Sequence, residues 1–345
     1  MATSRYGPPD ILDVDGVPVR LTSPDKPVFP GVTKREVLDY YLAVGPRLLA
    51  QVGGRPTALE RWPDGVSEGA EHFFQKHLPA KVPDYVEGIA VQFPSGRAGT
   101  LLNPATRAAV AWAVQMSTVT FHAWPVSATD VARPDQLRID LDPSPENSFT
   151  DVARVADSCR EILGDWGWPA YLKTSGGSGL HVFVPIRPDH GFVDVRHAAI
   201  AIGREAERRL PDLVTTSWWK EERGARVFVD FNQNAQDRVM ASAYSLRPRA
   251  NAPASMPIAW DDLAACAPDD FTVRTVPALV AGSADPWAGM AEHAVDLAPA
   301  LDAWHRDLAR GLPELPYPPD FPKMPGEPPR VQPSRKRSDT DDSAD

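Results

Sequence analysis

The sequence predicts an α+β protein with mainly antiparallel sheets flanked by helices. Short runs rich in β-branched and aromatic residues follow one another at 88–93, 99–103, 117–124 and 137–142. No helical pattern separates the last two of these runs, whereas a doubly wound parallel sheet would alternate strands with helices. Grouped strands therefore favour antiparallel pairing over a parallel sheet.

Amphipathic spacing predicts the main helices. Apolar residues recur at helical spacing in 32–52 after a Thr33 cap, and in 148–168 they form one stripe that ends near Gly164. A third helix is expected in 193–210 with Asp194 as its cap, and a fourth around 291–312.

Three further strands are expected after the second helix. The runs 170–175 and 179–186 flank a glycine turn, and in 225–232 apolar residues surround Asp230. The mixed order of these elements again favours an α+β domain.

Composition limits the class of protein. The chain has 345 residues, 43% of them hydrophobic, so it can bury a substantial core. Its two cysteines exclude a disulfide framework and a cysteine-rich zinc site. No apolar run suits a signal peptide or a membrane span, so a cytoplasmic protein is the simplest interpretation. A net charge of −10 excludes an overall positive coat but not a local patch for nucleic acid.

A proline-rich end marks the clearest boundary in the chain. Nine prolines fall between Pro313 and Pro333, and a charged stretch follows them. Such a segment can neither continue a helix nor supply a packed core. We expect a folded catalytic domain over 1–312 and a disordered tail over 313–345.

Two aspartates interrupt the apolar run LRIDLD. In a strand, Asp140 and Asp142 project to one face with their bases roughly 7 Å apart. Carboxylates this close repel each other unless a cation lies between them, and oxygen ligands favour Mg²⁺ or Mn²⁺. A solvated edge strand carrying two ordinary aspartates is the alternative.

Asp230 strengthens the metal hypothesis because it too ends an apolar strand, RVFVD. Three strand-borne acids can hold two metal ions, which activate an attacking oxygen and stabilise a leaving one. Zinc hydrolases use closely spaced histidine or cysteine ligands, which are lacking around these acids. Phosphoryl or nucleotidyl transfer fits better.

The glycine-rich turn from Ser175 to Gly179 can face an anion with its backbone N–H groups. No Gly-Lys-Ser/Thr follows, so the turn is not that of a P-loop, and a plain hairpin is the alternative. His181, two residues beyond, can donate to a phosphate oxygen. Arg247 and Arg249 flank Pro248, which stiffens the segment that carries the two guanidinium groups, and arginine forks suit phosphate. His122 alone is only weak evidence for a phosphate contact.

Two N-terminal features suit DNA. Phe73 and Phe74 are consecutive aromatics, so one of them can be exposed to stack on a base, although core packing with a local bend is the slightly favoured interpretation of these two residues alone. Lys26 and Lys34 bracket a loop that can present two ammonium groups to one phosphate. Surface lysines are also common without a function.

Together these stretches resemble the polymerase domain of bacterial DNA ligase D, a branch of the archaeo-eukaryotic primase superfamily. The resemblance spans about 21–312 and rests on seven motifs in family order: LTSPDKPVFP, FFQKHLP, FHAWP, RIDLDP, KTSGGSGLHVFVPI, VDFNQN and YSLRPR. It implies a primase-like fold and template-directed nucleotidyl transfer, with a preference for ribonucleotides and Mn²⁺.

The resemblance also implies roles for individual residues. The metal ligands and catalytic acids would be Asp140, Asp142 and Asp230. The incoming nucleotide would be contacted by His122, Ser175, Ser178, His181, Arg223, Gln233 and Arg247. DNA would be contacted by Lys26, Lys34, Phe73, Phe74 and Arg249, with the two lysines on the downstream 5′-phosphate.

The chain departs from the family in three respects. Ser178 stands where many members have a lysine, and the loop between Lys26 and Lys34 looks short. No ligase or phosphoesterase motif is found, so a stand-alone polymerase is expected.

This polymerase would act on gapped or primer-template DNA with NTP or dNTP, alongside repair factors such as Ku or a ligase. A catalytically dead binder of DNA ends and a metal-dependent phosphohydrolase are the alternatives.

Overall fold

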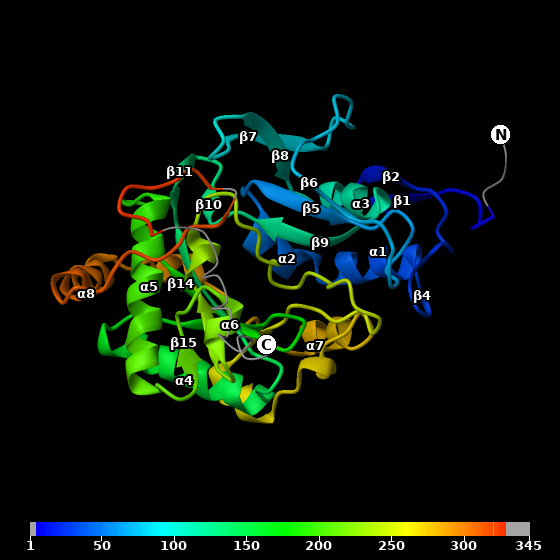
Figure 1. The fold of residues 1–345 in the computed structure, drawn as a ribbon. Helices are drawn as coiled ribbons and strands as arrows, with labels where there is room; N and C mark the ends of the chain where they lie inside the picture. The colour runs from blue at the N-terminus through cyan, green and yellow to red at the C-terminus, as the bar shows by residue number, and fades with distance from the viewer. Residues whose placement is uncertain (1–4, 320, 329–345) are drawn as a thin grey trace, which may run out of the picture.

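The computed structural model describes residues 5–319 and 321–328 (Figure 1). Within these residues the chain forms two halves, each built on one large sheet (Figure 1). Every ladder among the described strands is antiparallel except the pair β15–β16. The predicted α+β class is confirmed.

The N-terminal half carries a five-stranded sheet in the order β6-β5-β8-β7, with β9 also paired to β5. Its strands are β5 (Thr57–Arg61), β6 (Phe73–Gln75), β7 (Glu87–Gln92), β8 (Ala98–Asn103) and β9 (Thr118–Ala123). Three hairpins accompany it: β1 (Asp10–Val14) with β2 (Val17–Leu21), β3 (Pro27–Phe29) with β4 (Val32–Thr33), and β10 (Val126–Ser127) with β11 (Asp130–Pro134). The helices α1 (Lys34–Ala43), α2 (Gly45–Val52) and α3 (Arg107–Gln115) pack beside them.

The C-terminal half carries a six-stranded sheet in the order β15-β16-β12-β14-β13-β17. Its strands are β12 (Gln136–Asp142), β13 (Tyr171–Thr174), β14 (Leu180–Pro185), β15 (Val214–Thr215), β16 (Val227–Asp230) and β17 (Pro257–Ile258). The long helices α4 (Phe149–Asp165) and α5 (Phe192–Arg209) cover its outer face. Shorter elements complete this half: α6 (Lys220–Arg223), η1 (Phe231–Asn234), η2 (Trp260–Ala265), η3 (Pro268–Asp270), α7 (Val276–Gly282), η4 (Met290–His293) and α8 (Ala298–Ala309).

The helices begin and end largely where their sequences predict. Thr33 caps α1 with a reciprocal bond to Glu36, as expected, and the helical stripe after Ser148 forms α4. Pro46 starts a new helix rather than continuing α1, because its ring cannot fit in a helix interior. The expected cap at Asp194 is wrong: α5 begins after Gly191, and Asp194 lies in its first turn, where its charge favours the positive end of the helix dipole.

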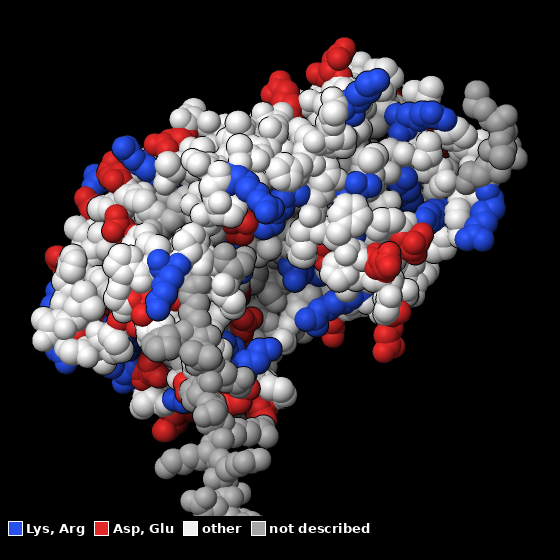
Figure 2. All heavy atoms as spheres, turned by 45° about the horizontal axis from the view of Figure 1, so that its top comes forward, with Lys and Arg blue, Asp and Glu red and all other residues white. Residues whose placement is uncertain are grey.

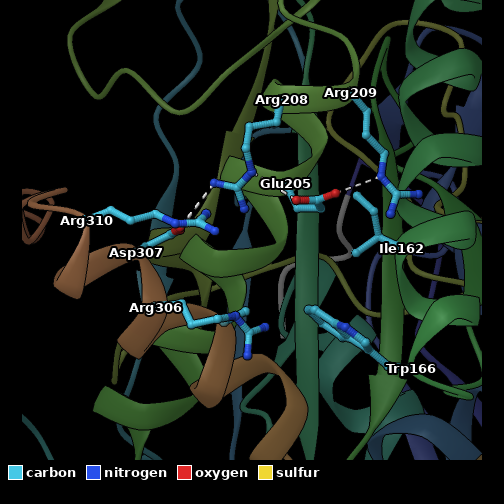
Figure 3. A pocket seen from close by; sticks show the side chains of 9 residues that line it. Ile162, Trp166, Glu205, Arg208, Arg209, Arg306, Asp307 and Arg310 are labelled. Atoms are coloured by element: carbon cyan, nitrogen blue, oxygen red, sulfur yellow. Dashed lines mark hydrogen bonds and ion pairs between the residues drawn. The ribbon is translucent and has the colours of Figure 1, made fainter.

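Helix α8 is held to α5 by an ion-pair network around a small pocket (Figure 3). Asp307, which is 1% exposed, accepts from Arg208 at 3.2 Å, and Arg209 bonds Asp165 of α4 at 2.6 Å. Glu205 accepts from both of these arginines at 2.9 Å. These pairs neutralise much of the positive charge, so the pocket is mainly a structural junction of three helices.

Residues 314–317, which belong to the expected tail, lie against helix α5. Arg196 of α5 is fully buried and bonds the Glu314 carboxylate and the carbonyls of Leu315 and Pro316. Tyr317 is only 2% exposed. Prolines lack an N–H donor, but their carbonyls still accept, so a buried arginine can order a proline-rich segment. Of the expected tail, residue 320 and residues 329–345 lie outside the described residues, and the disorder expected there stays a prediction.

The capping box of α4 gives a direct test of the local stability rules. Replacing Ser148 by Ala removes the side-chain acceptor of the Asp151 N–H and the partner of the Asp151 carboxylate. We expect the free energy of unfolding to fall by about 1 kcal/mol. Chemical denaturation measures this change, and a Ser148→Thr variant, whose hydroxyl can still accept from the Asp151 N–H and donate to the Asp151 carboxylate, should recover most of it.

Candidate active site

Four side chains form a row across one face of the six-stranded sheet. The register pairs Asp140 of β12 with Asp230 of β16 on one side and with His181 of β14 on the other. Lys173 of β13 is paired with His181. Because directly paired residues share a face, the ladders place these four groups side by side, with Asp142 two residues along β12.

The three aspartates converge as the sequence predicts. One carboxylate oxygen from each of Asp140, Asp142 and Asp230 lies within 4.8 Å of the other two. Burial raises the pKa of Asp140 to about 6, despite the nearby charges of Lys173 and Arg247. Repulsion from Asp140, followed by burial, raises the pKa of Asp142 to about 7. Burial and then the two other carboxylates raise the pKa of Asp230 to about 7.

These carboxylates suit a divalent cation. Their mutual repulsion raises two of the three pKa values, and a cation between them would remove this repulsion. Within residues 5–319 and 321–328 they form the one group of at least three acid, histidine or cysteine side chains placed to hold a metal ion. An all-oxygen donor set favours Mg²⁺ or Mn²⁺ over zinc.

A pocket of about 360 Å³ opens beside the carboxylates and contains most of the predicted site. It brings together Phe74, His122, Asp140, Asp142, Ser175, Ser178, His181, Gln233, Arg247 and Arg249. Figure 2 shows a hollow near the middle of this face, with Lys and Arg side chains along its border. Arg247 and Arg249 line the pocket itself, so a chain of net charge −10 still places positive side chains beside the acids.

The glycine turn closes on its own serine. The Ser175 hydroxyl oxygen accepts from the N–H groups of Gly177 at 3.0 Å and Gly179 at 3.1 Å. These two amides are therefore not free to bind an anion, and the turn offers fewer backbone N–H donors to a phosphate than the sequence predicts. With its oxygen occupied by two donors, the Ser175 O–H can donate into the pocket. Gly176 has φ +74°, and a side chain there would collide with Arg247.

His122 of β9 is fixed by an acid that the sequence analysis missed. Glu60 of β5 is 5% exposed, lines the pocket and lies 3.2 Å from His122 Nε2. Burial lowers the pKa of His122. Burial alone would raise the pKa of Glu60, but its hydrogen bond to His122 and the positive charges of His122 and Arg247 lower it. The position of Glu60 inside the apolar run TALERW could have identified it as a site residue.

Lys173 was missed as well. Its side chain is fully buried, with Nζ 2.5 Å from His181 Nδ1 and 2.6 Å from Ser255 Oγ. His181 Nε2 lies 3.2 Å from Asp140 Oδ1. Burial lowers the pKa of Lys173 and that of His181 well below their usual values. Lys173 therefore orients the histidine beside a predicted metal ligand, and a lysine within a buried strand was the signal.

Gln233 and Arg223 flank the acids in different ways. Gln233 donates to Asp230 Oδ2 at 3.0 Å, while its own buried Oε1 has no partner among the described residues. Arg223 does not line the pocket: it bonds the carbonyls of Ser217 and Trp218 and lies over Phe228. Its charge still acts on Asp142 and Asp230.

The two predicted lysines lie at the ends of the β3–β4 hairpin, whose backbone joins Lys34 N to Lys26 O at 2.8 Å. Lys34 is 6% exposed, and burial together with the charges of Lys26 and Arg61 lowers its pKa to about 8. It donates to Thr22 O and Gln115 Oε1. Lys26 Nζ lies 3.4 Å from Asp64 Oδ1, an exposed acid that offsets part of the positive charge of the pair.

Both predicted aromatics are exposed, Phe73 by 46% and Phe74 by 42%. In β6 they alternate, so that Phe74 lies 5.2 Å from the His122 ring and Phe73 lies under Arg61. The alternative of core packing is therefore wrong for both rings.

Comparison with known proteins decides the family. The family described as "LigD, primase-polymerase domain" matches residues 33–287, which include all three aspartates. The chain belongs to this LigD primase-polymerase family. The resemblance predicted from the seven motifs is confirmed, and with it a nucleotidyltransferase domain of the polymerase class.

The LigD relatives are longer proteins. The chain is 33% identical over 251 residues to the multifunctional non-homologous end joining protein LigD of Mycolicibacterium smegmatis, covering 71% of this chain and 32% of that protein. It is 32% identical to LigD of Pseudomonas aeruginosa, with coverage of 85% and 35%. The chain thus spans about a third of the length of these relatives.

A solved LigD structure confirms the fold. The polymerase domain from Mycobacterium tuberculosis ligase D in complex with DNA superposes with a TM-score of 0.72 at 28% identity, covering 79% of this chain and 98% of that one. The primase-like fold predicted from the motifs is therefore confirmed. No helix in the described part of the chain has the length and apolar character needed to cross a membrane.

The raised pKa values of the acids predict how pH controls metal binding. Protons compete with a cation for Asp140, whose pKa is about 6, and for Asp142 and Asp230, whose pKa values are about 7. We expect Mn²⁺ affinity to weaken steeply as the pH falls below about 7 and to level off above it. Mn²⁺ titration by electron paramagnetic resonance checks this; affinity independent of pH in that interval would contradict it.

Proposed function

We propose that the chain catalyses template-directed nucleotidyl transfer, extending a primer strand across short gaps or at breaks during bacterial end joining. The observation that carries this proposal is the convergence of three strand-borne carboxylates beside a pocket lined by phosphate-binding side chains. The similarity to a LigD polymerase domain solved in complex with DNA supports DNA as the partner.

The pocket's own residues account for nucleotide binding. Arg247 and the free O–H of Ser175 face the same cavity and can donate to triphosphate oxygens, and His181 lines this cavity with its ring nitrogens beside Lys173 and Asp140. Two cations held by the three aspartates, Mn²⁺ in preference to Mg²⁺, would activate the primer 3′-hydroxyl and neutralise charge on the phosphates. Lys173 holds His181 in position, and the unpartnered Gln233 Oε1 can accept from a nucleotide hydroxyl. Such an acceptor suits the ribonucleotide preference proposed from the family resemblance.

The N-terminal half supplies the DNA contacts in this proposal. Phe73 and Phe74 are exposed aromatic rings on which template bases can stack. Lys26 and Lys34 form a compact cationic pair suited to a downstream 5′-phosphate. A ligase would complete repair, because gap filling leaves a nick to be sealed, and an end-binding protein such as Ku is the second partner in this proposal.

The alternatives differ in what they need from the acids. A pure binder of DNA ends gains nothing from three repelling carboxylates whose pKa values are raised, and a phosphohydrolase would need no template. Metal-dependent incorporation of labelled nucleotide on a gapped duplex separates the three functions. Excision repair rather than end joining would leave the chemistry unchanged.

The metal ligands give the central prediction. We expect Asp140→Ala and Asp230→Ala each to lower nucleotide incorporation by at least roughly a hundredfold while retaining most DNA binding, because they remove charge stabilisation of the reaction and not of the complex. Asp157→Ala, an exposed acid on α4, is the matched control. Primer extension and gel-shift assays measure both properties. Extension that survives either active-site substitution would sink the proposal.

The lysine pair gives a second prediction. We expect a downstream 5′-phosphate to stimulate gap filling by the parent chain, and Lys26→Ala to remove this stimulation while leaving extension on an open primer-template unchanged. The exposed Lys323 provides a control variant, Lys323→Ala. Extension assays on gapped duplexes with and without the phosphate measure the effect. A parent chain indifferent to the phosphate would remove the role assigned to Lys26.

A further inference from the structure

The segment Pro313–Tyr317, here called the C-terminal strap, returns from α8 across α5 (Figure 1). It lies beyond residues 33–287, the part of the chain that matches the LigD family. The strap nevertheless makes some of the most buried polar contacts in the described structure. These contacts lead directly to a predicted metal ligand.

Arg196 is the anchor of the strap. Its side chain has no exposed surface, and three of its hydrogen bonds end on the strap: Glu314 Oε1 at 2.8 Å, Leu315 O at 2.8 Å and Pro316 O at 3.0 Å. The Tyr317 ring lies 3.7 Å from the guanidinium carbon. Despite burial, bonds from His197 and Arg196 lower the pKa of Glu314 to about 2. Without the strap, a buried guanidinium would lose nearly all its acceptors.

Asn232 connects this anchor to the metal site. Its side-chain oxygen accepts from Arg196 Nε at 2.7 Å, and its side-chain nitrogen donates to Pro316 O at 3.0 Å. Its backbone N–H donates to Asp230 Oδ1 at 2.9 Å. Arg196 and Pro316 each hydrogen-bond one end of the Asn232 side-chain amide. Because Asn232 is only 2% exposed, the amide cannot turn without breaking a buried hydrogen bond.

We propose that the C-terminal strap, through Arg196 and Asn232, positions Asp230 for metal binding. Asp230 is repelled by two other carboxylates, so its side chain needs an external restraint to remain beside them when no cation is bound. Groups that orient a metal ligand typically change metal affinity by 10- to 100-fold. Neither Asn232 nor Arg196 lines the pocket beside the acids, so in this proposal both are positioning residues. The inference rests on the metal site of the proposed function.

The test compares two variants of the full chain that each remove a contact around the strap. Asn232→Ala cuts the connection from the strap to Asp230. His197→Ala removes the 2.6 Å contact with Glu314 Oε2 but leaves Asn232 untouched. Mn²⁺ affinity without nucleotide is measured by electron paramagnetic resonance, and stability by thermal unfolding.

We expect Asn232→Ala to weaken Mn²⁺ binding by about 10- to 100-fold and His197→Ala to leave it unchanged, while both lower the melting temperature. Unchanged affinity in Asn232→Ala, or equal weakening in both variants, would overturn the inference. If Asn232→Ala does not fold, Arg196→Lys replaces it and is expected to weaken binding similarly, because an ammonium cannot span Asn232 and the strap together.

This experiment separates the inference from the proposed function. A parent chain that binds Mn²⁺ but does not extend a primer would contradict the proposed function and leave the inference standing. A parent chain that extends primers while the Asn232→Ala variant keeps its Mn²⁺ affinity would do the reverse.

Discussion

The structure depends on keeping three carboxylates together against their own repulsion. Sheet register does most of this, because the β12–β16 ladder pairs Asp140 directly with Asp230, and the two-residue period of β12 places Asp142 on the same face. Shifting either strand by one residue would turn its acids toward the helices α4 and α5. The buried side chains of Ile139 and Leu141, which face those helices, therefore fix the metal site as well as the core.

The positive groups near the acids are arranged so that few of them form ion pairs with the acids. Lys173 contacts His181 and Ser255 rather than a carboxylate, and Arg247 lies against the glycine turn. A direct ion pair would neutralise the acids and occupy the position that a cation needs. His181 lies between Lys173 and Asp140, so the lysine amine contacts the histidine ring and not the carboxylate. Because no lysine or arginine among the described residues pairs directly with the three aspartates, their pKa values are raised and their carboxylate oxygens remain accessible to a cation.

Charged residues inside apolar strands were the most reliable indication of functional-site residues in the sequence. The sequence analysis recognised only some of them. The signal predicted Asp140, Asp142 and Asp230, yet Lys173 and Glu60 stand in equally apolar surroundings and were missed, because a single charge has no obvious partner until the strands are paired. The fold class followed from the grouping of strands. The strap could not be predicted, since the composition of 313–317 says nothing about a buried arginine more than a hundred residues earlier. A proline-rich composition favours disorder, but the long-range hydrogen bonds to Arg196 outweigh this local preference.

The serine at position 178 shows how a local departure can be balanced by a distant element. Ser178 is exposed in the turn and brings no charge, at a position where the family resemblance leads us to expect a lysine. Arg249 approaches the same turn so closely that a Cβ on Gly177 would lie 2.7 Å from its Nη2. Pro248 limits the backbone between Arg247 and Arg249, so both guanidinium groups reach the pocket from one short segment. The positive charge at the turn therefore comes from that segment rather than from the turn itself, and Gly177 is needed for its close approach.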